Sequence, residues 1–234
     1  LIAKANGGDF LLRIEDTDQK RYVEGATDII YSTLKMVGMN WDEGPDIGGN
    51  YGPYVQSERK DLYAPYAHKL VELGGAHYCF CAEREKQLDE DGNEIIAKFE
   101  DPCKHITLEE AKRRVAAGEP YVIRQTINKK GKSQYEDKVY GTIEIDYDEL
   151  DEGVLLKSDG FPTYNFAHIV DDAEMGVTHV MRGVEYLSST PNYLALYDAL
   201  GLERPKLVSL PHILAPQGNK KLGKRDGNGV KVRA

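Results

Sequence analysis

Three carboxylates and a hydroxyl follow a short, mostly apolar stretch near the start of the chain. Residues 10–14 read FLLRI, which is typical of a short buried strand, and Glu15, Asp16, Thr17 and Asp18 come directly after it. Acidic side chains at the carboxyl end of a buried strand lie where open α/β sheets bind their ligands. Asp and Thr are also favoured N-caps, so position alone leaves open whether these residues cap a helix or bind a ligand.

The cysteines of the chain occur in two pairs of equal spacing. Cys79 and Cys81 form one pair, and Cys103 and His105 form the other. In an extended chain, residues i and i+2 point to the same face, so each pair would present two ligands side by side. Three thiolates and an imidazole are a closed set that is typical of structural zinc. Three buried cysteines without metal are the alternative, but the paired spacing favours Zn²⁺ and a reduced thiol site.

A basic cluster lies near the end of the chain, where Lys220, Lys221, Lys224 and Arg225 stand close together. Two lysines three positions apart on a loop could follow a triphosphate as negative charge moves onto the leaving pyrophosphate. Taken alone, such a run is more often a solvated surface.

The composition limits the class of protein. Of the 234 residues, 41% are hydrophobic and 29% are charged, which is the profile of a globular protein with a substantial core. No apolar stretch approaches the roughly 20 residues that a membrane helix needs, and no signal peptide is visible, so we expect a cytoplasmic protein without membrane contact. The formal net charge of −9 argues against non-specific nucleic-acid binding over the whole surface, although a local basic face stays possible. Because Leu1 is not an initiator methionine, we expect the start of the protein to lie upstream.

Apolar residues have helical spacing in the first third of the chain. The pattern over residues 22–37 predicts one helix, and a second, from Leu62 to Leu73, is closed by Gly74. Residues 39–52 are rich in Gly, Pro, Asn and Asp and predict a loop. We expect both helices to pack on a sheet.

Short strands dominate the middle of the chain, and α/β character returns near Gly153. Thr107 and Glu110 form a capping box for a helix that Gly118 ends. The predicted strands lie at residues 77–81, 121–127, 135–140, 142–145, 154–157, 177–182 and 207–210, with a further helix at 191–200. These elements predict an α/β domain in two parts, 1–76 and 151–210, an inserted α+β domain at 77–150, and a basic loop with its continuation at 211–234.

Four stretches carry a resemblance to a known family. They read RIEDTD at 13–18, RYVEGA at 21–26, WDEGP at 41–45 and YVQSER at 54–59. Together they resemble the first half of the catalytic domain of bacterial glutamyl-tRNA synthetases, which are class I aminoacyl-tRNA synthetases. The resemblance covers the whole chain. It implies a Rossmann-like α/β fold with a parallel sheet, whose first strand is missing, interrupted by a zinc-bearing insert, and it identifies the chain as an internal fragment of the catalytic region.

The resemblance also implies a set of site residues. Glu15, Tyr164 and Arg182 match positions that hold the amino acid, and His168 matches a further pocket position. A guanidinium suits a carboxylate substrate, although Tyr164 alone is typical of a core aromatic and Arg182 of a surface ion pair. The lysine loop matches the family's catalytic loop, with Lys221 and Lys224 acting on ATP that is bound with Mg²⁺. The implied ATP-binding residues are Glu185, Lys221, Leu222, Gly223, Lys224 and Arg225.

A few positions depart from the family's usual pattern. Gly223 stands where a serine is usual, and Asp226 stands where a histidine is common. Val184 replaces an acid, and Tyr186 replaces His or Trp. The first two departures affect the lysine loop, and the other two affect the adenosine side of the pocket.

The implied activity is ATP-dependent activation of L-glutamate to glutamyl-adenylate, followed by transfer to the 3′ end of tRNA(Glu), in a monomer whose insert binds the acceptor end. The family's first signature and its anticodon-binding half fall outside the chain, so we expect these residues alone to be inactive. One alternative is a glutamyl-queuosine tRNA(Asp) synthetase. Another is a non-catalytic, zinc-stabilised RNA-binding protein.

Overall fold

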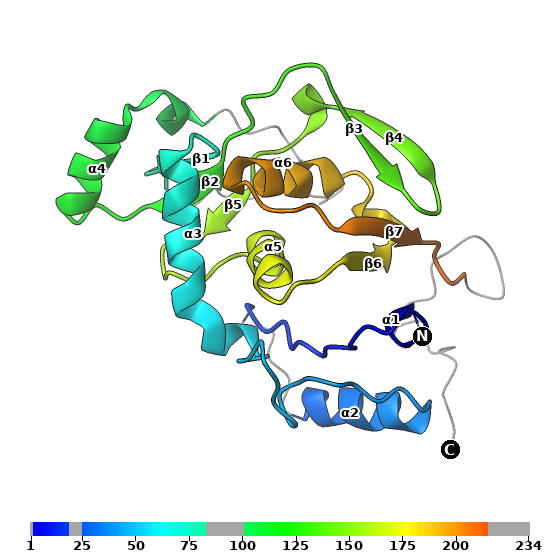
Figure 1. The fold of residues 1–234 in the computed structure, drawn as a ribbon. Coiled ribbons are helices and arrows are strands. Elements are labelled where there is room, and N and C mark those ends of the chain that lie inside the picture. Colours follow the sequence, from blue (N-terminus) through cyan, green and yellow to red (C-terminus); the bar gives the residue numbers. More distant parts are fainter. Residues whose placement is uncertain (1, 19–24, 83–100, 215–234) are drawn as a thin grey trace, which may run out of the picture.

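Helices α3 (Lys60–Glu72), α5 (Tyr164–Glu174) and α6 (Thr190–Leu200) pack against one another at the centre of the structure (Figure 1). The computed structural model describes residues 2–18, 25–82 and 101–214. The helices bury apolar side chains against one another, which is the main source of stability in such a fold. The core includes Tyr63, Leu70, Phe166, Ile169 and Leu196.

A first sheet covers one side of this core. It contains β1 (Ala76–Cys79), β2 (Val122–Gln125) and β5 (Val154–Leu156), in the order β1-β2-β5, and both pairings are antiparallel. Ile123 and Leu156 are register partners and are both buried. The sheet thereby fixes the end of β1, which leads to Cys79, next to the helices.

A second sheet is mixed and has the order β4-β3-β7-β6. Its strands are β3 (Lys132–Asp137), β4 (Gly141–Asp146), β6 (His179–Gly183) and β7 (Lys206–Leu210). The β3–β4 hairpin is antiparallel, whereas β6 pairs with β7 in parallel over five positions. β3 also pairs with β7 in parallel, at Asp137 and Leu207. The expected parallel sheet is therefore represented, within the described residues, mainly by β6 and β7.

Both sheets join parts of the chain that the sequence assigns to different domains. β2 pairs with β5, and β3 pairs with β7, across the predicted boundary at residue 150. Backbone pairing thus ties the predicted insert to the second part of the α/β domain. The remaining described elements are α1 (Ile2–Ala5), α2 (Ala26–Met36), α4 (Leu108–Ala116), and the 3₁₀ turns η2 (Gln56–Arg59), η3 (Pro102–His105), η4 (Tyr147–Glu149) and η5 (Val184–Tyr186).

Several local predictions are confirmed. Helix α4 begins after Thr107, whose side chain accepts from the Glu110 N–H at 3.3 Å, and Gly118 follows its end with φ of 80°. Gly74 has φ of 78° just after α3, a conformation that glycine adopts without a Cβ clash. No helix in residues 2–18, 25–82 and 101–214 is long and apolar enough to cross a membrane.

Other local predictions differ from the structure. Residues 10–14 form only isolated parallel bridges, Leu11 with Glu43 and Ile14 with Val55, and their side chains are half-buried, so the predicted buried strand is an extended segment. Helix α2 buries none of its side chains within the described structure, and Ile29 is 66% exposed. The prediction that this helix packs on a sheet is therefore wrong for the part of the chain described.

The buried face of α3 also differs from the prediction. Leu62 and Leu73, which were expected on the inner side, are 40% and 55% exposed. The side chains that face the core are Tyr63, Ala67, Leu70 and Val71. The helix is therefore rotated by about one position, which places an aromatic side chain with a hydroxyl in the core.

Helix α5 has no counterpart among the predicted elements. Residues 164–174 were interpreted as pocket residues, yet Phe166, Ile169, Val170 and Ala173 have the i, i+3, i+4, i+7 spacing of an amphipathic helix. Thr163 precedes it in an extended conformation, as an N-cap residue does. The helix brings Tyr164 and His168, one turn apart, to the same face.

Candidate functional site

Helix α5 carries two carboxylates into the core. Asp171 and Asp172 follow the apolar residues 166–170 and are 0% and 6% exposed. Burying a carboxylate is costly unless the group is paired and hydrogen bonded. Asp171 meets this condition, because it accepts from Arg59 Nε at 2.7 Å and from Gln56 Nε2 at 2.8 Å. This contact fixes α5 against the segment that leads into α3.

Asp172 and Glu15 share one guanidinium. Arg13 Nη2 donates to Glu15 Oε1 at 2.8 Å and to Asp172 Oδ1 at 2.9 Å. Burial alone would lower the pKa of Arg13, but Asp172 and Glu15 outweigh it and raise this pKa. Burial alone would also raise the pKa of Asp172, but His168 and Arg13 hold it below its usual value. Arg13 and Asp172 therefore stay charged at neutral pH, and the shared hydrogen bonds link the first segment to α5.

The residues of the acidic stretch at 15–18 make different contacts. Asp16 accepts from Ser57 N at 2.8 Å and from Ser57 Oγ at 2.6 Å, so its side chain holds the turn before α3. Thr17 is buried. Glu15 instead extends toward α5 and acts electrostatically on Tyr164 and His168. The stretch thus includes a residue that holds a turn, Asp16, and one that is linked to α5 through Arg13, Glu15.

The four predicted substrate-binding residues come together around α5. The ring centroids of Tyr164 and His168 are 5.3 Å apart, and the His168 ring meets Tyr193 edge-on at 4.7 Å. Arg182 is the next-to-last residue of β6, with its guanidinium 5.1 Å from the Tyr193 ring centroid. Burial raises the pKa of Tyr164, and Glu15 adds to this effect while Arg182 opposes it. The opposite charges of Glu15 and Arg182 therefore act on one shared aromatic residue.

Several polar atoms of this group have no hydrogen-bond partner among the residues that the structure describes. Both ring nitrogens of His168 are buried without a hydrogen bond, although its Nδ1 is 3.5 Å from Asp172 Oδ2. Arg182 Nη1 is likewise buried and unpaired. Unpaired buried polar groups are costly, so they are expected where a ligand supplies the partner. A carboxylate suits the guanidinium of Arg182, and an ammonium group suits Glu15.

The residues predicted to bind ATP are only partly described. Glu185 lies in η5 after β6, is exposed, and has its Oε2 3.5 Å from His212 Nδ1. The predicted lysine loop, residues 220–225, falls outside the described residues. Its assignment to the phosphates therefore remains a prediction from the sequence.

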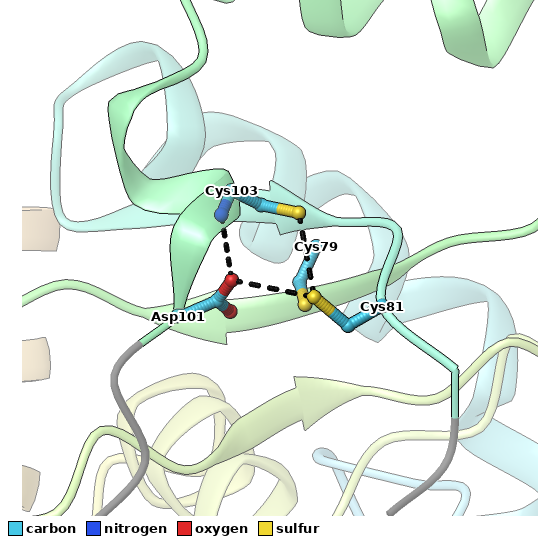
Figure 2. Close-up of side chains that lie close together, drawn as sticks. All are labelled: Cys79, Cys81, Asp101 and Cys103. Carbon is cyan, nitrogen blue, oxygen red and sulfur yellow. Dashed lines mark hydrogen bonds between the residues drawn. The ribbon is translucent and has the colours of Figure 1, made fainter.

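A second group of ligand-type side chains lies where β1 ends. Cys79, Cys81, Cys103 and Asp101 each offer one ligand atom, and these atoms lie within 4.8 Å of one another (Figure 2). Cys81 Sγ is 3.7 Å from Cys103 Sγ and 3.8 Å from Asp101 Oδ1. A tetrahedral ion with Zn–S bonds of ~2.3 Å holds its sulfurs about 3.8 Å apart. The donor set and its spacing therefore fit zinc.

His105 is not a member of this group. The prediction treated Cys103 and His105 as part of an extended chain, in which both would face the same way. Residues Pro102–His105 instead form the 3₁₀ turn η3, in which positions i and i+2 differ in direction by about 240°. Asp101 caps this turn, accepting from Cys103 N at 2.8 Å, which brings its carboxylate to the sulfurs. His105 is exposed.

The surroundings of Asp101 fix its orientation. Asp101 Oδ2 lies 3.0 Å from His77 Nε2 and 3.4 Å from Arg124 Nε. Burial and then Asp101 raise the pKa of the Cys79 thiol to about 12, so this thiol would ionise at neutral pH only beside a cation. The sequence reasoning missed both Asp101 and His77. The signal was present in Asp101, because Asp followed by Pro is typical of the start of a helical turn.

Comparisons with known proteins point to the family that the sequence resembles. Residues 1–233 match the family described as "tRNA synthetases class I (E and Q), catalytic domain". A glutamate–tRNA ligase of Clostridium tetani is 54% identical over 231 residues, which are 97% of this chain and 47% of that protein. One from Clostridium botulinum (strain Eklund 17B / Type B) is 52% identical with the same coverage. The chain thus spans about half the length of the curated relatives it matches.

A solved structure also resembles this fold. The crystal structure of a glutamate tRNA ligase from Elizabethkingia meningosepticum, in complex with its amino acid, superposes with a TM-score of 0.86 at 39% sequence identity. The match covers 97% of this chain and 47% of that one. These findings confirm the resemblance seen in the sequence. The chain belongs to the class I tRNA synthetases (E and Q) and carries the α/β fold of their catalytic domain.

Proposed function

We propose that the natural protein containing this chain is a glutamate–tRNA ligase, which activates L-glutamate with ATP and transfers it to tRNA(Glu). The observation that carries the proposal is that Glu15 and Arg182 both lie near the helix that carries Tyr164 and His168. Arg13 links Glu15 to Asp172 on that helix, and Arg182 lies over the Tyr193 ring, which meets His168 edge-on. An acidic amino acid has one ammonium and two carboxylates, so it needs an acid and a guanidinium in the same pocket. The relatives with more than half of their residues identical support this assignment.

In the proposed first step, the glutamate α-carboxylate attacks the α-phosphorus of ATP and pyrophosphate leaves. In the second, a terminal ribose hydroxyl of tRNA attacks the adenylate carbonyl and AMP leaves. Arg182 would bind a carboxylate of glutamate and Glu15 its ammonium group, so these side chains orient the substrate for attack. Lys221 and Lys224 are proposed to hold the phosphates. Mg²⁺, bound with ATP, would neutralise phosphate charge.

We also propose that one structural Zn²⁺ is held by Cys79, Cys81, Cys103 and Asp101. The three sulfurs and one carboxylate leave no open position for chemistry, so the ion would hold the end of β1 to η3. We propose that this region contacts the acceptor end of tRNA. Three free thiols that lie this close together suit a reducing compartment, which supports a cytoplasmic protein.

The test is ATP–pyrophosphate exchange by the natural protein, with tRNA present and with L-glutamate, L-glutamine or L-aspartate as the amino acid. We expect exchange with glutamate and little with the other two, followed by charging of tRNA(Glu). Exchange that is independent of the amino acid would contradict the proposal. Transfer of glutamate to tRNA(Asp) alone would instead support a glutamyl-queuosine tRNA(Asp) synthetase.

A further inference from the structure

Glu15 and Asp172 of helix α5 accept hydrogen bonds from the same nitrogen atom of Arg13. Arg13 Nη2 donates to both Glu15 Oε1 and Asp172 Oδ1, at 2.8 and 2.9 Å. The side chains of Arg13 and Asp172 are only 11% and 7% exposed, whereas that of Glu15 is 31% exposed. Glu15 is therefore the most exposed member of a linkage whose other two side chains are largely covered.

Glu15 would be poorly fixed without this linkage. Its side chain has three rotatable bonds and is partly exposed, so holding it in one rotamer costs conformational entropy. Arg13 lies two positions earlier in an extended segment, on the same side of the chain, and restrains the Glu15 carboxylate through a charge-assisted hydrogen bond. Asp172 in turn restrains Arg13 from a rigid helix.

The charges around Arg13 also suit an ammonium ligand. Arg13 and Arg59 bring two positive charges, and Glu15, Asp171 and Asp172 bring three negative charges. The cluster therefore carries one net negative charge, and only Glu15 presents part of it outside the core. Arg13 neutralises charge that would otherwise be buried, while the excess remains at the exposed carboxylate.

We infer that Arg13 is a positioning residue, clamped by Asp172, that holds the Glu15 carboxylate for the α-amino group of the substrate. This inference rests on the proposed function. Arg13 does not touch the substrate itself, and its effect is transmitted through Glu15. The same clamp ties Glu15 to the helix that carries Tyr164 and His168, so the two sides of the pocket keep a fixed separation.

The test compares Arg13→Gln, Asp172→Asn and the double variant in the natural protein, by ATP–pyrophosphate exchange. We expect the KM for glutamate to rise at least about tenfold in each, while the KM for ATP stays within about twofold. The double variant should match the single ones, because all three break one linkage. Asp198→Asn is the matched control, since Asp198 also holds two cations, Lys129 and Arg204, on the surface.

Glutarate, which is glutamate without the amino group, provides the second readout. As a competitive inhibitor it should bind the Arg13→Gln variant and the wild type equally well, because it has no ammonium for Glu15. Weaker glutarate binding, equal rises in both KM values, or an unchanged KM for glutamate would overturn the inference. KM does not depend on the amount of active protein, so partial unfolding does not imitate the effect, and Asp172→Asn carries the test if Arg13→Gln does not fold. A wild-type protein without glutamate-dependent exchange would instead refute the proposed function, and the inference with it.

Discussion

Asp171 on α5 and Arg59 at the end of η2 form a buried ion pair, with 2.7 Å between Asp171 Oδ1 and Arg59 Nε. Their side chains are 0% and 3% exposed. The guanidinium also donates to the backbone carbonyls of Tyr51 and Pro53, at 3.2 and 3.1 Å. The pair therefore joins α5, the turn before α3 and the preceding loop, and it holds in place the helix that carries Tyr164 and His168.

The first prediction concerns stability. Asp171→Ala leaves the Arg59 guanidinium buried without its carboxylate, and breaking such a pair costs about 3–5 kcal/mol. Chemical denaturation of the two proteins measures the change in unfolding free energy. The control is Asp198→Ala, which removes a surface partner of Arg204 and is expected to cost about 0–1 kcal/mol. Equal losses in the two variants would show that burial does not set the strength of the Asp171 pair.

The second prediction concerns metal. The protein purified without chelator is expected to contain about one zinc per chain, and Cys103→Ser is expected to lose it. The structure further predicts that Asp101→Asn weakens zinc binding, whereas His105→Asn retains it. Elemental analysis with a competing chelator measures both. Loss of zinc in His105→Asn alone would restore the ligand set that the sequence suggested.

The sequence predicted the three thiols of the candidate metal site but not its fourth member. The spacing of Cys79, Cys81 and Cys103 was enough to predict that three thiols meet. The fourth member depended on whether the residues after Cys103 continue as an extended chain or form a turn, and in the sequence only the Asp101–Pro102 pair favours the turn. The capping contact of Asp101 decides this, and it exists only once the 3₁₀ turn forms.

For the residues around α5, the sequence likewise indicated the proposed substrate-binding side chains but not the side chains that hold them. The resemblance supplied Glu15, Tyr164, His168 and Arg182, and the structure brings them around one helix. It did not supply the buried residues that hold them, because Arg13 and Asp172 contact each other across 159 positions of the chain. Periodicity along the chain reports only local neighbours, so a pairing of this kind is visible only after the fold has formed.

The third prediction concerns substrate choice. Arg182→Ala removes a guanidinium with a buried, unpaired nitrogen. It should lower kcat/KM for glutamate, and the loss corresponds to about 2–4 kcal/mol of transition-state stabilisation. The KM for ATP should change far less. Arg204→Ala, which removes an exposed guanidinium, is the control and should leave both substrates unaffected. Equal losses for glutamate and ATP would place Arg182 in the scaffold of β6 instead of the glutamate pocket.

The last prediction concerns the dependence of stability on pH. Burial lowers the pKa of His168 in the folded protein, although Asp172 partly opposes burial. In the unfolded chain the imidazole takes a proton near its ordinary pKa of about 6.5. Below that pH the unfolded state binds more protons than the folded state, so the unfolding free energy should fall as the pH decreases from 7.5 to 5.5.

His168→Gln removes the contribution of His168 to the pH dependence of stability, because glutamine does not titrate. The slope of unfolding free energy against pH should therefore be shallower in the variant, by at most about 1.4 kcal/mol per pH unit. His68, whose pKa is also lowered by burial, is present in both proteins and cancels in the comparison. Denaturation curves at several pH values, measured without glutamate, give the two slopes. Parallel slopes would mean that His168 takes its proton in the folded pocket as readily as in the unfolded chain, with the Asp172 carboxylate stabilising the imidazolium.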